Sequence, residues 1–253
     1  MVITGASRGL GAALARHLSG PGTALRLVAR DGAALAAVAA ECAARGAQVE
    51  HAACDVTDGP ALARLLHGWD RDGPVTHVVA NAGITSGTPE HGGLEEPAAA
   101  RRCLEVNLQG AMNAVEPLLP AFRARGAGHV ALVCSVAAFR GLPDSPAYCA
   151  AKAGLWAWGE ALRARLGPEG VRVTVLAPGF FTSGMSARYA GPHPGEVAAG
   201  AMAARLWRGV EQGRGQVVAP AWLGWALRAL ALLPAPLSDA LARRHRFRIT
   251  APP

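Results

Sequence analysis

The chain has 253 residues, 51% of them hydrophobic and 17% charged, and this composition excludes an intrinsically disordered or collagen-like protein. The formal net charge is +7, but the arginines are scattered apart from ARRHRFR at 242–248, so we expect no nucleic-acid partner. Neither a disulfide framework nor a metal site is predicted by the cysteines, which are odd in number and lack a CxxC pair: Cys42, Cys54, Cys103, Cys134 and Cys149. The start MVITGAS lacks the features of a signal peptide, and we expect a cytoplasmic protein.

Short β-branched runs alternate with segments of helical periodicity along the chain. The predicted strands are 2–4, 25–29, 49–54, 77–80, 129–134, 171–177 and 216–219. Between them apolar residues recur at helical spacing, as in Leu10, Leu14 and Leu18, or in Leu155, Trp158, Leu162 and Leu166. This alternation predicts an α/β fold, a doubly wound sheet of about seven parallel strands with helices on both faces.

The first predicted strand is followed directly by TGASRGLG, which opens into a predicted helix. Glycines allow a tight turn and a close approach of the backbone to a pyrophosphate, and the start of the helix favours negative charge. Such turns also occur for geometry alone, but the strand before and the helix after favour phosphate binding. We therefore expect the dinucleotide to contact Gly5, Ser7, Arg8, Gly9, Leu10 and Gly11.

The second predicted strand ends in LVARD, at the position that faces the adenosine ribose in folds of this type. Arg30, with Arg8 as a second guanidinium, suits the 2′-phosphate and favours NADP(H) over NAD(H). The alternative is that Arg30 is an ordinary surface arginine and that Asp31 discriminates. Asp55 and Val56 follow the third predicted strand and are expected to border the adenine, unless Asp55 only caps the next helix.

Lys152 is the only lysine among 25 basic residues, in a chain that uses arginine elsewhere. Tyr148 precedes it by four positions, which on a helix places both side chains on one face. A nearby ammonium lowers the pKa of a phenol toward the range that acid–base catalysis needs, and lysine is more compact than arginine. The alternatives are chance and an ordinary Tyr–Lys pair facing solvent.

Several short motifs follow one another along the chain: TGASRGLG (4–11), NAG (81–83), Asn107 in VNLQG, Ser135, YCAAK (148–152) and PG (178–179). In the order and interval of these motifs the chain resembles the short-chain dehydrogenase/reductase family. The resemblance runs from residue 2 to about residue 220. It implies a Rossmann-like fold and an NAD(P)-dependent oxidoreductase that acts on CH–OH and C=O groups. It also implies an active site of Asn107, Ser135, Tyr148 and Lys152.

The resemblance assigns a role to each of these side chains. Tyr148 would exchange a proton with the substrate oxygen, Ser135 would position that oxygen, and Lys152 would hold the nicotinamide ribose and tune the phenol. Asn107 would bend its helix and hold a water that relays protons to Lys152. Two alternatives remain: Ser135 as a helix cap, and Asn107 as a core amide satisfied by the backbone.

Further cofactor contacts follow from the same resemblance. Asn81, Ala82 and Gly83 would line the side of the adenine ribose and brace the sheet. The nicotinamide would lie against Pro178, Gly179, Phe181 and Ser183. Ser183 stands where the family usually has threonine, with Thr182 as an alternative donor, and Ala80 departs from the asparagine that usually begins the fourth-strand motif.

Substrate contacts are expected after PG and toward the C-terminus. An apolar roof over the substrate is suggested by Phe180, Phe181, Met185 and Tyr189, together with MAARLW (202–207) and WLGWALRALALLP (222–234). Such a roof favours a hydrophobic carbonyl or alcohol as substrate. For Trp222, Trp225 and Leu232 we rank packing against a second subunit or the core first. Contact of residues 217–248 with a membrane surface is a lower-ranked alternative, since 217–234 is interrupted and short for a membrane span.

We expect one domain over 1–253, with 1–130 mainly dinucleotide-binding, 131–220 catalytic and substrate-binding, and 221–253 an apolar and basic C-terminal extension. The resemblance implies a homodimer or homotetramer built through the helices around 97–123 and 147–166. The alternative to an enzyme is a non-catalytic NADP(H)-binding regulatory or sensor protein, against which the complete catalytic set argues.

Overall fold

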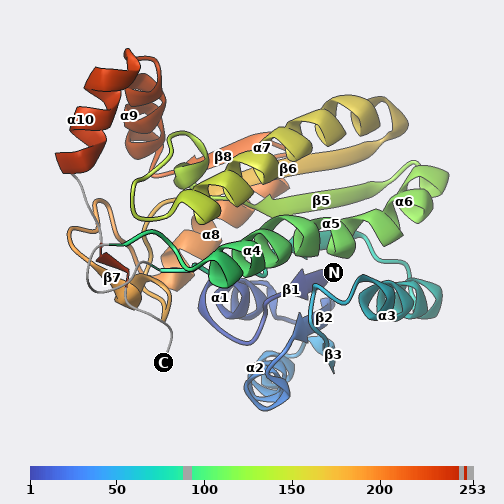
Figure 1. The fold of residues 1–253 in the computed structure, drawn as a ribbon. Helices are drawn as coiled ribbons and strands as arrows, with labels where there is room; N and C mark the ends of the chain where they lie inside the picture. The colour runs from blue at the N-terminus through green and yellow to red at the C-terminus, as the bar shows by residue number, and fades with distance from the viewer. Residues whose placement is uncertain (88–92, 245–247, 250–253) are drawn as a thin grey trace.

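The computed structural model describes residues 1–87, 93–244 and 248–249. At its centre lies a parallel sheet of seven strands in the order β3–β2–β1–β4–β5–β6–β8 (Figure 1). The strands are β1 (Val2–Thr4), β2 (Ala24–Ala29), β3 (Gln48–Ala53), β4 (His77–Ala80), β5 (Gly128–Val133), β6 (Val171–Pro178) and β8 (Gln216–Ala219). Each bound lies within one residue of the sequence prediction, so the predicted sheet is confirmed.

Helices cover both faces of the sheet (Figure 1). One face carries α1 (Gly9–Leu18), α2 (Gly32–Ala44) and α8 (Ala199–Glu211), and the other carries α3 (Gly59–Asp72), α4 (Pro97–Leu104), α5 (Gly110–Val115), α6 (Leu119–Arg125) and α7 (Pro146–Leu166). Because side chains alternate along a strand, Ile3 packs in the core on the α1 face and Val2 in the core on the other. Burial on both faces explains why inner strands such as β4 and β5 read as continuous apolar runs.

The strand order reverses between β1 and β4. After β1 the chain adds β2 and β3 on one side, then returns to place β4 on the other. Val2 of β1 lies opposite Arg26 of β2 and also opposite Val78 of β4. In open sheets of this type, ligands bind beyond the carboxyl ends of the strands at such a reversal. The segments after β1 and β4 are therefore the first place to look for a ligand site.

Helix α8 differs from its predicted use. Met202, Leu206 and Trp207 of MAARLW are buried in the core that α8 shares with α1. The prediction that this segment covers the substrate is wrong, because its apolar stripe packs against the sheet and α1 rather than over the site.

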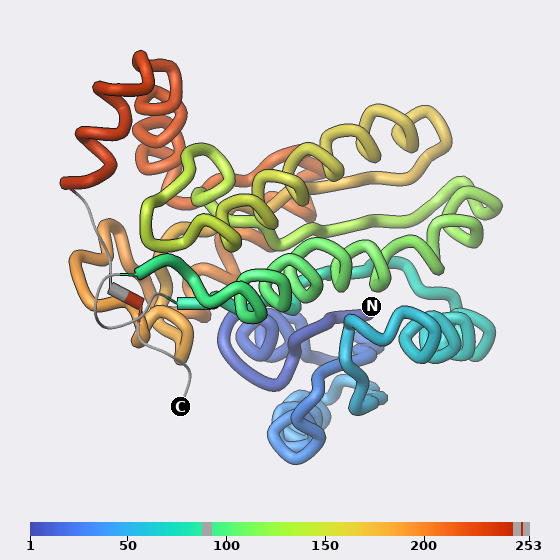
Figure 2. Tube along the Cα trace, in the orientation of Figure 1, coloured from blue at the N-terminus to red at the C-terminus, as the bar shows by residue number. Residues whose placement is uncertain are grey.

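The C-terminal part forms two further helices, α9 (Ala221–Ala231) and α10 (Ala235–Arg244), which project as a hairpin from the body (Figure 2). Trp222, Trp225 and Leu232 are 56%, 68% and 87% exposed. Their predicted packing into the core is therefore wrong, while packing against a second subunit stays a prediction. Residues 245–247 of ARRHRFR lie outside the described residues.

A second, two-stranded antiparallel sheet joins β7 (Tyr189–Ala190) to β9 (Arg248–Ile249). It was not predicted, because two residues are too few to show a strand period. Within 1–87, 93–244 and 248–249, no helix is both long enough and apolar enough to cross a bilayer.

Two histidines lie side by side at the start of β4 and β5. His77 is opposite His129 in the register, and their rings stack with centroids 5.4 Å apart. His129 Nε2 donates to Thr174 Oγ1 at 2.8 Å, since that hydroxyl donates its own proton to Arg214 O. Burial lowers the pKa of both imidazoles to about 4, with the Met1 ammonium and Arg172 adding to the effect on His77.

We predict that the free energy of unfolding decreases as the pH falls from about 6.5 toward 4. Over that interval the two histidines bind protons in the unfolded chain but not in the folded one, because their folded pKa is lowered. Chemical denaturation at a series of pH values measures the effect. His129→Asn should flatten the slope whatever its cost in stability, whereas His17→Asn, exposed on α1, should leave the slope unchanged.

Candidate active site

The turn between β1 and α1 requires glycine. Gly5 and Gly9 have φ of +65° and +56°, in the left-handed region that residues with a Cβ rarely adopt. A Cβ on Gly11 would lie 2.3 Å from the carbonyl oxygen of Gly5 and 2.5 Å from Asn81 Nδ2. The turn is closed so tightly that no side chain fits at this position.

Helix α1 begins at this turn without a side-chain cap. Its N-cap residue, Arg8, is extended and exposed and makes no cap hydrogen bond. The first N–H groups of the helix and the positive end of its dipole thus face the carboxyl end of β1. Ser7 is half-buried in the turn, and Leu10 anchors the helix in the core. This arrangement fits a pyrophosphate.

Asn81 and Thr4 fasten the turn to β4. Asn81 Nδ2 donates to the carbonyl oxygens of Thr4 and Gly5, at 2.9 and 3.2 Å. The buried hydroxyl of Thr4 accepts from the backbone N–H groups of Asn81 and Ala82, at 3.0 and 3.2 Å. The segment after β4 therefore fixes the shape of the glycine turn across the point where the strand order reverses.

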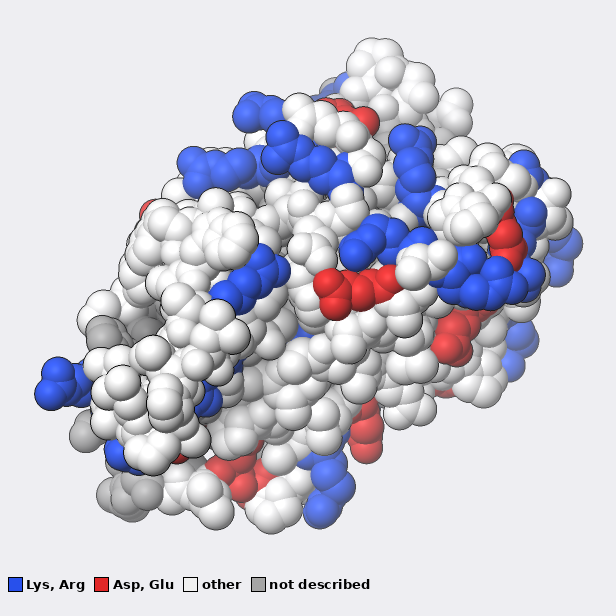
Figure 3. Space-filling view, turned by 90° about the horizontal axis from the view of Figure 1, so that it is seen from above, with Lys and Arg blue, Asp and Glu red and all other residues white. Residues whose placement is uncertain are grey.

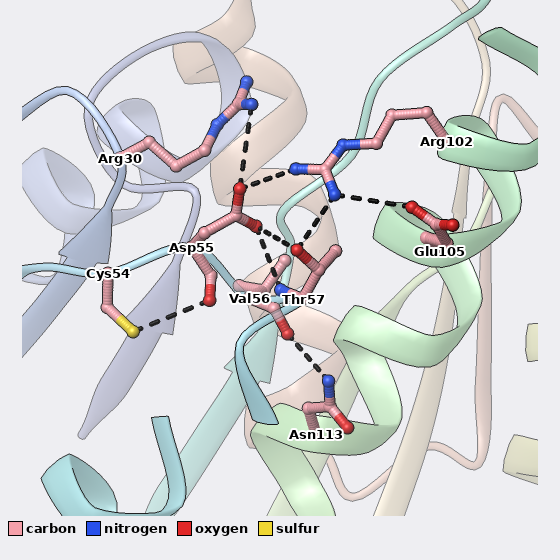
Figure 4. A network of polar contacts seen from close by, with 8 residues as sticks. All are labelled: Arg30, Cys54, Asp55, Val56, Thr57, Arg102, Glu105 and Asn113. Atoms are coloured by element: carbon pink, nitrogen blue, oxygen red, sulfur yellow. Dashed lines mark hydrogen bonds and ion pairs between the residues drawn. The ribbon is translucent and has the colours of Figure 1, made fainter. Parts of the chain in front are cut away.

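The carboxylate of Asp55 gathers three side chains beside the end of β2 (Figure 4). Its Oδ1 accepts from the backbone N–H and the hydroxyl of Thr57, both at 2.9 Å, and its Oδ2 lies 2.6 Å from Arg102 Nη2. Arg30 lies at 3.9 Å from Oδ2 and is half-exposed. Burial alone would raise the pKa of Asp55, but the bonds from Thr57 and Arg102 outweigh it and lower that pKa.

The sequence left open whether Asp55 caps the next helix and whether Asp31 rather than Arg30 discriminates between cofactors. The helix caps in the structure bear on both questions. The helix after β3 is capped by Asp58, which accepts from Ala61 N at 3.0 Å, so Asp55 is not the cap. Asp31 accepts from Ala34 N at 3.0 Å and caps α2. Val56, next to Asp55, is buried and offers its carbonyl oxygen to Asn113 Nδ2 at 2.9 Å. The guanidinium of Arg30 is therefore the more available of the two charges at the tip of β2.

Ser135, Tyr148 and Lys152 meet beyond the end of β5. Ser135 caps a short 3₁₀-helix (Val136–Ala138) by accepting from Ala137 N at 3.2 Å, and its hydroxyl lies close enough to the phenol of Tyr148 to lower the pKa of that phenol. Lys152 is buried, and its ammonium lies 5.7 Å from the centre of the Tyr148 ring. The ammonium donates to Val133 O at 2.9 Å. The structure thus brings these three predicted residues together on α7 and the end of β5.

The pKa of the phenol differs from the sequence expectation. Burial raises the pKa of Tyr148 well above its ordinary value, the second phenol at Tyr189 raises it further, and the hydrogen bond with Ser135 opposes them. Burial also lowers the pKa of Lys152. The expected acidification of Tyr148 by Lys152 is therefore not present, because the ammonium binds the Val133 carbonyl and desolvation dominates at the phenol.

Asn107 lies at the centre of a π-helical turn (Glu105–Gln109) between α4 and α5. Its side chain is fully buried, and both ends of its amide bind the backbone of Ile84: Oδ1 accepts from the N–H at 2.9 Å and Nδ2 donates to the carbonyl at 2.8 Å. A Cβ on Gly83 would lie 2.7 Å from that Oδ1 and 3.6 Å from Lys152 Nζ. The amide of Asn107 thus holds the chain after β4 against the pocket of the ammonium, and a π-helical turn is common at functional sites.

The segment after β6 closes the site from the other side. Ser135 Oγ donates to Pro178 O at 3.5 Å, and Gly179 N donates to Ala219 O at 2.7 Å. A Cβ on Gly9 would lie 3.8 Å from Ser183 Cβ, so this segment borders the glycine turn.

Both hydroxyls considered for the nicotinamide already accept backbone N–H groups. Ser183 Oγ accepts from Ser186 N at 3.0 Å, and Thr182 Oγ1 accepts from Ala199 N at 3.3 Å. Phe181, also predicted to contact the cofactor, is half-buried beside α8. Ser183 Oγ also donates to Ser186 Oγ at 3.3 Å, whereas Thr182 Oγ1 donates to no residue among 1–87, 93–244 and 248–249, so Thr182 is the more available donor.

Three contacts of the site escaped the sequence reasoning. Glu95 accepts from Ala147 N at 2.8 Å and so caps α7, the helix that carries Tyr148 and Lys152, while also accepting from Ser86. The other two are Thr4, whose hydroxyl accepts from the chain after β4, and Arg102, which pairs with Asp55. Glu95 and Arg102 lie in no run that marks a site. Thr4 begins the motif TGASRGLG, but its contact with the chain after β4 depends on the fold.

A family model described as short chain dehydrogenase matches residues 1–191. The chain belongs to the short-chain dehydrogenase family. A protein of Myxococcus xanthus (strain DK1622), described as an uncharacterized oxidoreductase, is 36% identical over 246 residues, 97% of this chain and 96% of that protein. The structure of a short-chain dehydrogenase from Sphingobium yanoikuyae in complex with NADPH is similar, with a TM-score of 0.77 and 25% identity over 96% of this chain and 92% of that one. The structure of an NAD⁺-bound xylitol dehydrogenase is also similar, with a TM-score of 0.68 and 26% identity over 73% of this chain and 71% of that one.

As a short-chain dehydrogenase, the protein is an oxidoreductase that acts on CH–OH and C=O groups and binds a nicotinamide dinucleotide. The site described above fits such a cofactor. The tight glycine turn leaves room for a pyrophosphate at the uncapped start of α1, and an exposed guanidinium stands at the tip of β2.

Gly11→Ala tests the steric limit of the glycine turn. We expect a loss of stability of about 1 to 3 kcal/mol, because the new Cβ would overlap the Gly5 carbonyl, together with weaker NADPH binding. Gly68→Ala is the matched control, since Gly68 lies in α3, a Cβ there would have no atom of the described residues within 4 Å, and the variant should gain stability from helix propensity. Thermal melting and tryptophan fluorescence titration with NADPH provide the readouts. Equal behaviour of the two variants would contradict the assignment of the turn.

Proposed function

We propose that the protein is an NADP(H)-dependent oxidoreductase that interconverts a carbonyl and an alcohol on a hydrophobic substrate, with Tyr148 as general acid/base. The observation that carries the proposal is the meeting of two hydroxyl-bearing side chains, Ser135 and Tyr148, with a buried ammonium at the end of β5. In a sheet of this type that position faces the ligand. The nicotinamide would supply or accept the hydride.

The residues of the chain would handle the proton and the substrate oxygen. The phenol of Tyr148 carries its proton at neutral pH and would donate it to a carbonyl oxygen as that oxygen gains negative charge. Burial raises the pKa of Tyr148 and so makes this donation harder, while Ser135 lowers that pKa and opposes the effect. Ser135 would donate to the same oxygen and hold it in place. Lys152 would bind the nicotinamide ribose from its place beneath the phenol, and Asn107 would fix the chain between β4 and this pocket.

The preference for NADP(H) rests on Arg30. The Asp55 carboxylate is held by Arg102 at 2.6 Å, whereas Arg30 stands off at 3.9 Å, and Asp31 is engaged as a helix cap. A half-exposed guanidinium at the tip of β2 can turn to a 2′-phosphate with two parallel hydrogen bonds. The Sphingobium relative was seen with NADPH and the xylitol dehydrogenase with NAD⁺, so NAD(H) is the alternative that the experiments below address.

The preference for a hydrophobic substrate rests on the segment after β6. Phe180 packs edge-on against Tyr189, with ring centroids 6.0 Å apart, and stacks on His193 at 4.8 Å. Tyr189 also raises the pKa of Tyr148, so we place this aromatic group on the substrate side of the phenol. Such a wall favours an apolar ketone or alcohol over a sugar.

The remaining assignments belong to the same proposal. Residues 1–130 would mainly bind the dinucleotide, 131–220 would carry catalysis and the substrate, and 221–253 would form the C-terminal extension, of which 245–247 and 250–253 lie outside the described residues. The homodimer or homotetramer is carried over from the family resemblance, and the cytoplasmic location rests on the cysteines, which lack a CxxC pair and are odd in number.

Replacing the phenol tests the catalytic role. With an apolar ketone and NADPH, we expect Tyr148→Phe to lose at least about 10²-fold in kcat while keeping its melting temperature and its affinity for NADPH. Tyr189→Phe removes the only other phenolic hydroxyl of the chain and should lose far less. Unchanged turnover in Tyr148→Phe would reject the mechanism, and NADPH binding without turnover of any ketone by the parent would favour a sensor instead.

The cofactor preference is tested at Arg30. We expect the parent protein to bind NADPH more tightly than NADH, and Arg30→Ala to weaken NADPH binding by roughly tenfold or more, since one charged bidentate contact is lost, with little effect on NADH. Arg71→Ala, exposed at the opposite end of α3, serves as the control and should change neither affinity. Tighter binding of NADH by the parent would overturn the preference.

A further inference from the structure

The α9–α10 hairpin presents an apolar surface to solvent. On α9 the exposed residues Trp222, Trp225, Ala226 and Ala229 recur at helical spacing, so they form one stripe. The stripe continues into 231–237, where every residue is exposed and apolar, with Leu232 at 87% and Leu237 at 51%. No charged residue occurs between Arg228 and Asp239. This surface, Trp222 to Leu237, is called the apolar tip below.

The inner side of the hairpin is fastened to the catalytic body, so the tip is held outward. Arg228 of α9 lies over the ring of Phe139 at 4.0 Å and over that of Trp156 at 5.3 Å. Arg140 donates to Ser238 Oγ at 2.8 Å and pairs with Asp239, both on α10. The two helices are themselves joined by the bond from Ser238 Oγ to Leu230 O at 2.8 Å.

Close packing beneath α9 adds to these contacts. A Cβ on Gly224 would lie 2.4 Å from Val218 Cγ1 and 3.3 Å from Phe139. The helix therefore cannot be rolled to bury its tryptophans without breaking the contact with β8. The exposure of the apolar tip is built into the fold rather than left by a poorly packed end.

Two exposed arginines lie at the end of α10 that is farther from the turn of the hairpin. Arg243 and Arg244 are exposed at the end of α10, and neither forms an ion pair with any residue of 1–87, 93–244 or 248–249. Asp239 is the only acidic residue of the hairpin, and Arg140 neutralises it. Seen from above, other arginines are spread over the body rather than gathered in one stripe (Figure 3). The hairpin thus combines exposed apolar area with two arginines that form no ion pair among the described residues.

Charge and length decide between the partners that could cover this surface. A second copy of the chain carries the same net charge of +7 and the same arginines at the end of α10, so electrostatic repulsion works against pairing two hairpins. An anionic lipid surface has the opposite charge, takes tryptophan at the level of its headgroups, and accepts leucine beneath them. α9 has 11 residues, so it can lie in the interface but cannot span the bilayer.

We propose that the α9–α10 hairpin docks the protein reversibly on an anionic membrane surface, with Trp222, Trp225, Leu232 and Leu237 inserted at headgroup depth and Arg243 and Arg244 bound to lipid phosphates. The hairpin rests on Phe139 and Arg140, a few residues after Ser135, so docking would bring the catalytic side of the sheet close to the bilayer. The inference does not depend on the cofactor or on turnover.

The test is co-sedimentation of the full chain with vesicles of phosphatidylcholine alone and of phosphatidylcholine mixed with phosphatidylglycerol. We expect binding to the mixed vesicles that weakens with added salt. Trp222→Ser/Trp225→Ser and Arg243→Gln/Arg244→Gln should each bind roughly tenfold or more weakly. Arg64→Gln/Arg71→Gln removes the same charge from the exposed face of α3 and should bind like the parent.

Melting temperatures and NADPH binding should be unchanged in all three variants, because every substituted side chain is exposed. Absence of binding to mixed vesicles by the parent would overturn the proposal. Equal binding to neutral vesicles would overturn the role of the arginines. A parent oligomer that Trp222→Ser/Trp225→Ser dissociates in sedimentation velocity, without vesicle binding, would assign the tip to a second copy of the chain.

Discussion

One hydrogen bond, from Lys152 Nζ to the carbonyl oxygen of Val133 at 2.9 Å, links the two elements on which the site depends. Val133 is the last residue of β5, and Lys152 lies one turn beyond Tyr148 on α7. A buried ammonium without a partner is costly, so the lysine must find an acceptor there. The thiol of Cys134 adds a second link by donating to Lys152 O at 3.0 Å. Through these bonds the helix can present its phenol only in one place, beside Ser135.

Burial then sets the chemistry of the pair. It raises the pKa of Tyr148 and lowers that of Lys152. The expectation that the neighbouring ammonium lowers the pKa of the phenol therefore does not hold in this structure. A phenol held protonated suits the reduction of a carbonyl. The glycine turn lies across the strand-order reversal from this pair, and the amides of Asn81 and Asn107 fix both sides of the chain that follows β4. The same short segment therefore shapes both the cradle for the dinucleotide and the pocket of the ammonium.

Local sequence patterns were enough to predict the strands of the central sheet and the glycine turn. The seven strands could be predicted because runs such as VRVTVLA are long enough to show their composition, and the glycine turn because Gly5, Gly9 and Gly11 lie within one short motif. The partners of Asp55 could not be predicted in the same way. Arg102 lies 47 positions away, and nothing in its neighbourhood marks it.

The C-terminal helices show a second limit. Their periodicity indicates an apolar stripe but not which way the stripe faces, and Trp222 and Trp225 face solvent where core packing was one expectation. Gly224 decides the matter, since its missing Cβ lets α9 approach Val218 on the opposite side. Glu95 is similar: it caps α7 from another segment, and no residue of α7 itself reveals the need for it.

The most direct test of the central claim is the turnover of Lys152→Arg and Lys152→Met with NADPH and an apolar ketone. If a compact buried ammonium is required, both variants should melt cooperatively and yet lose at least about 10²-fold in kcat, the arginine variant included although it keeps the charge. Turnover by Lys152→Arg at the rate of the parent protein would show that charge alone suffices and would contradict the account.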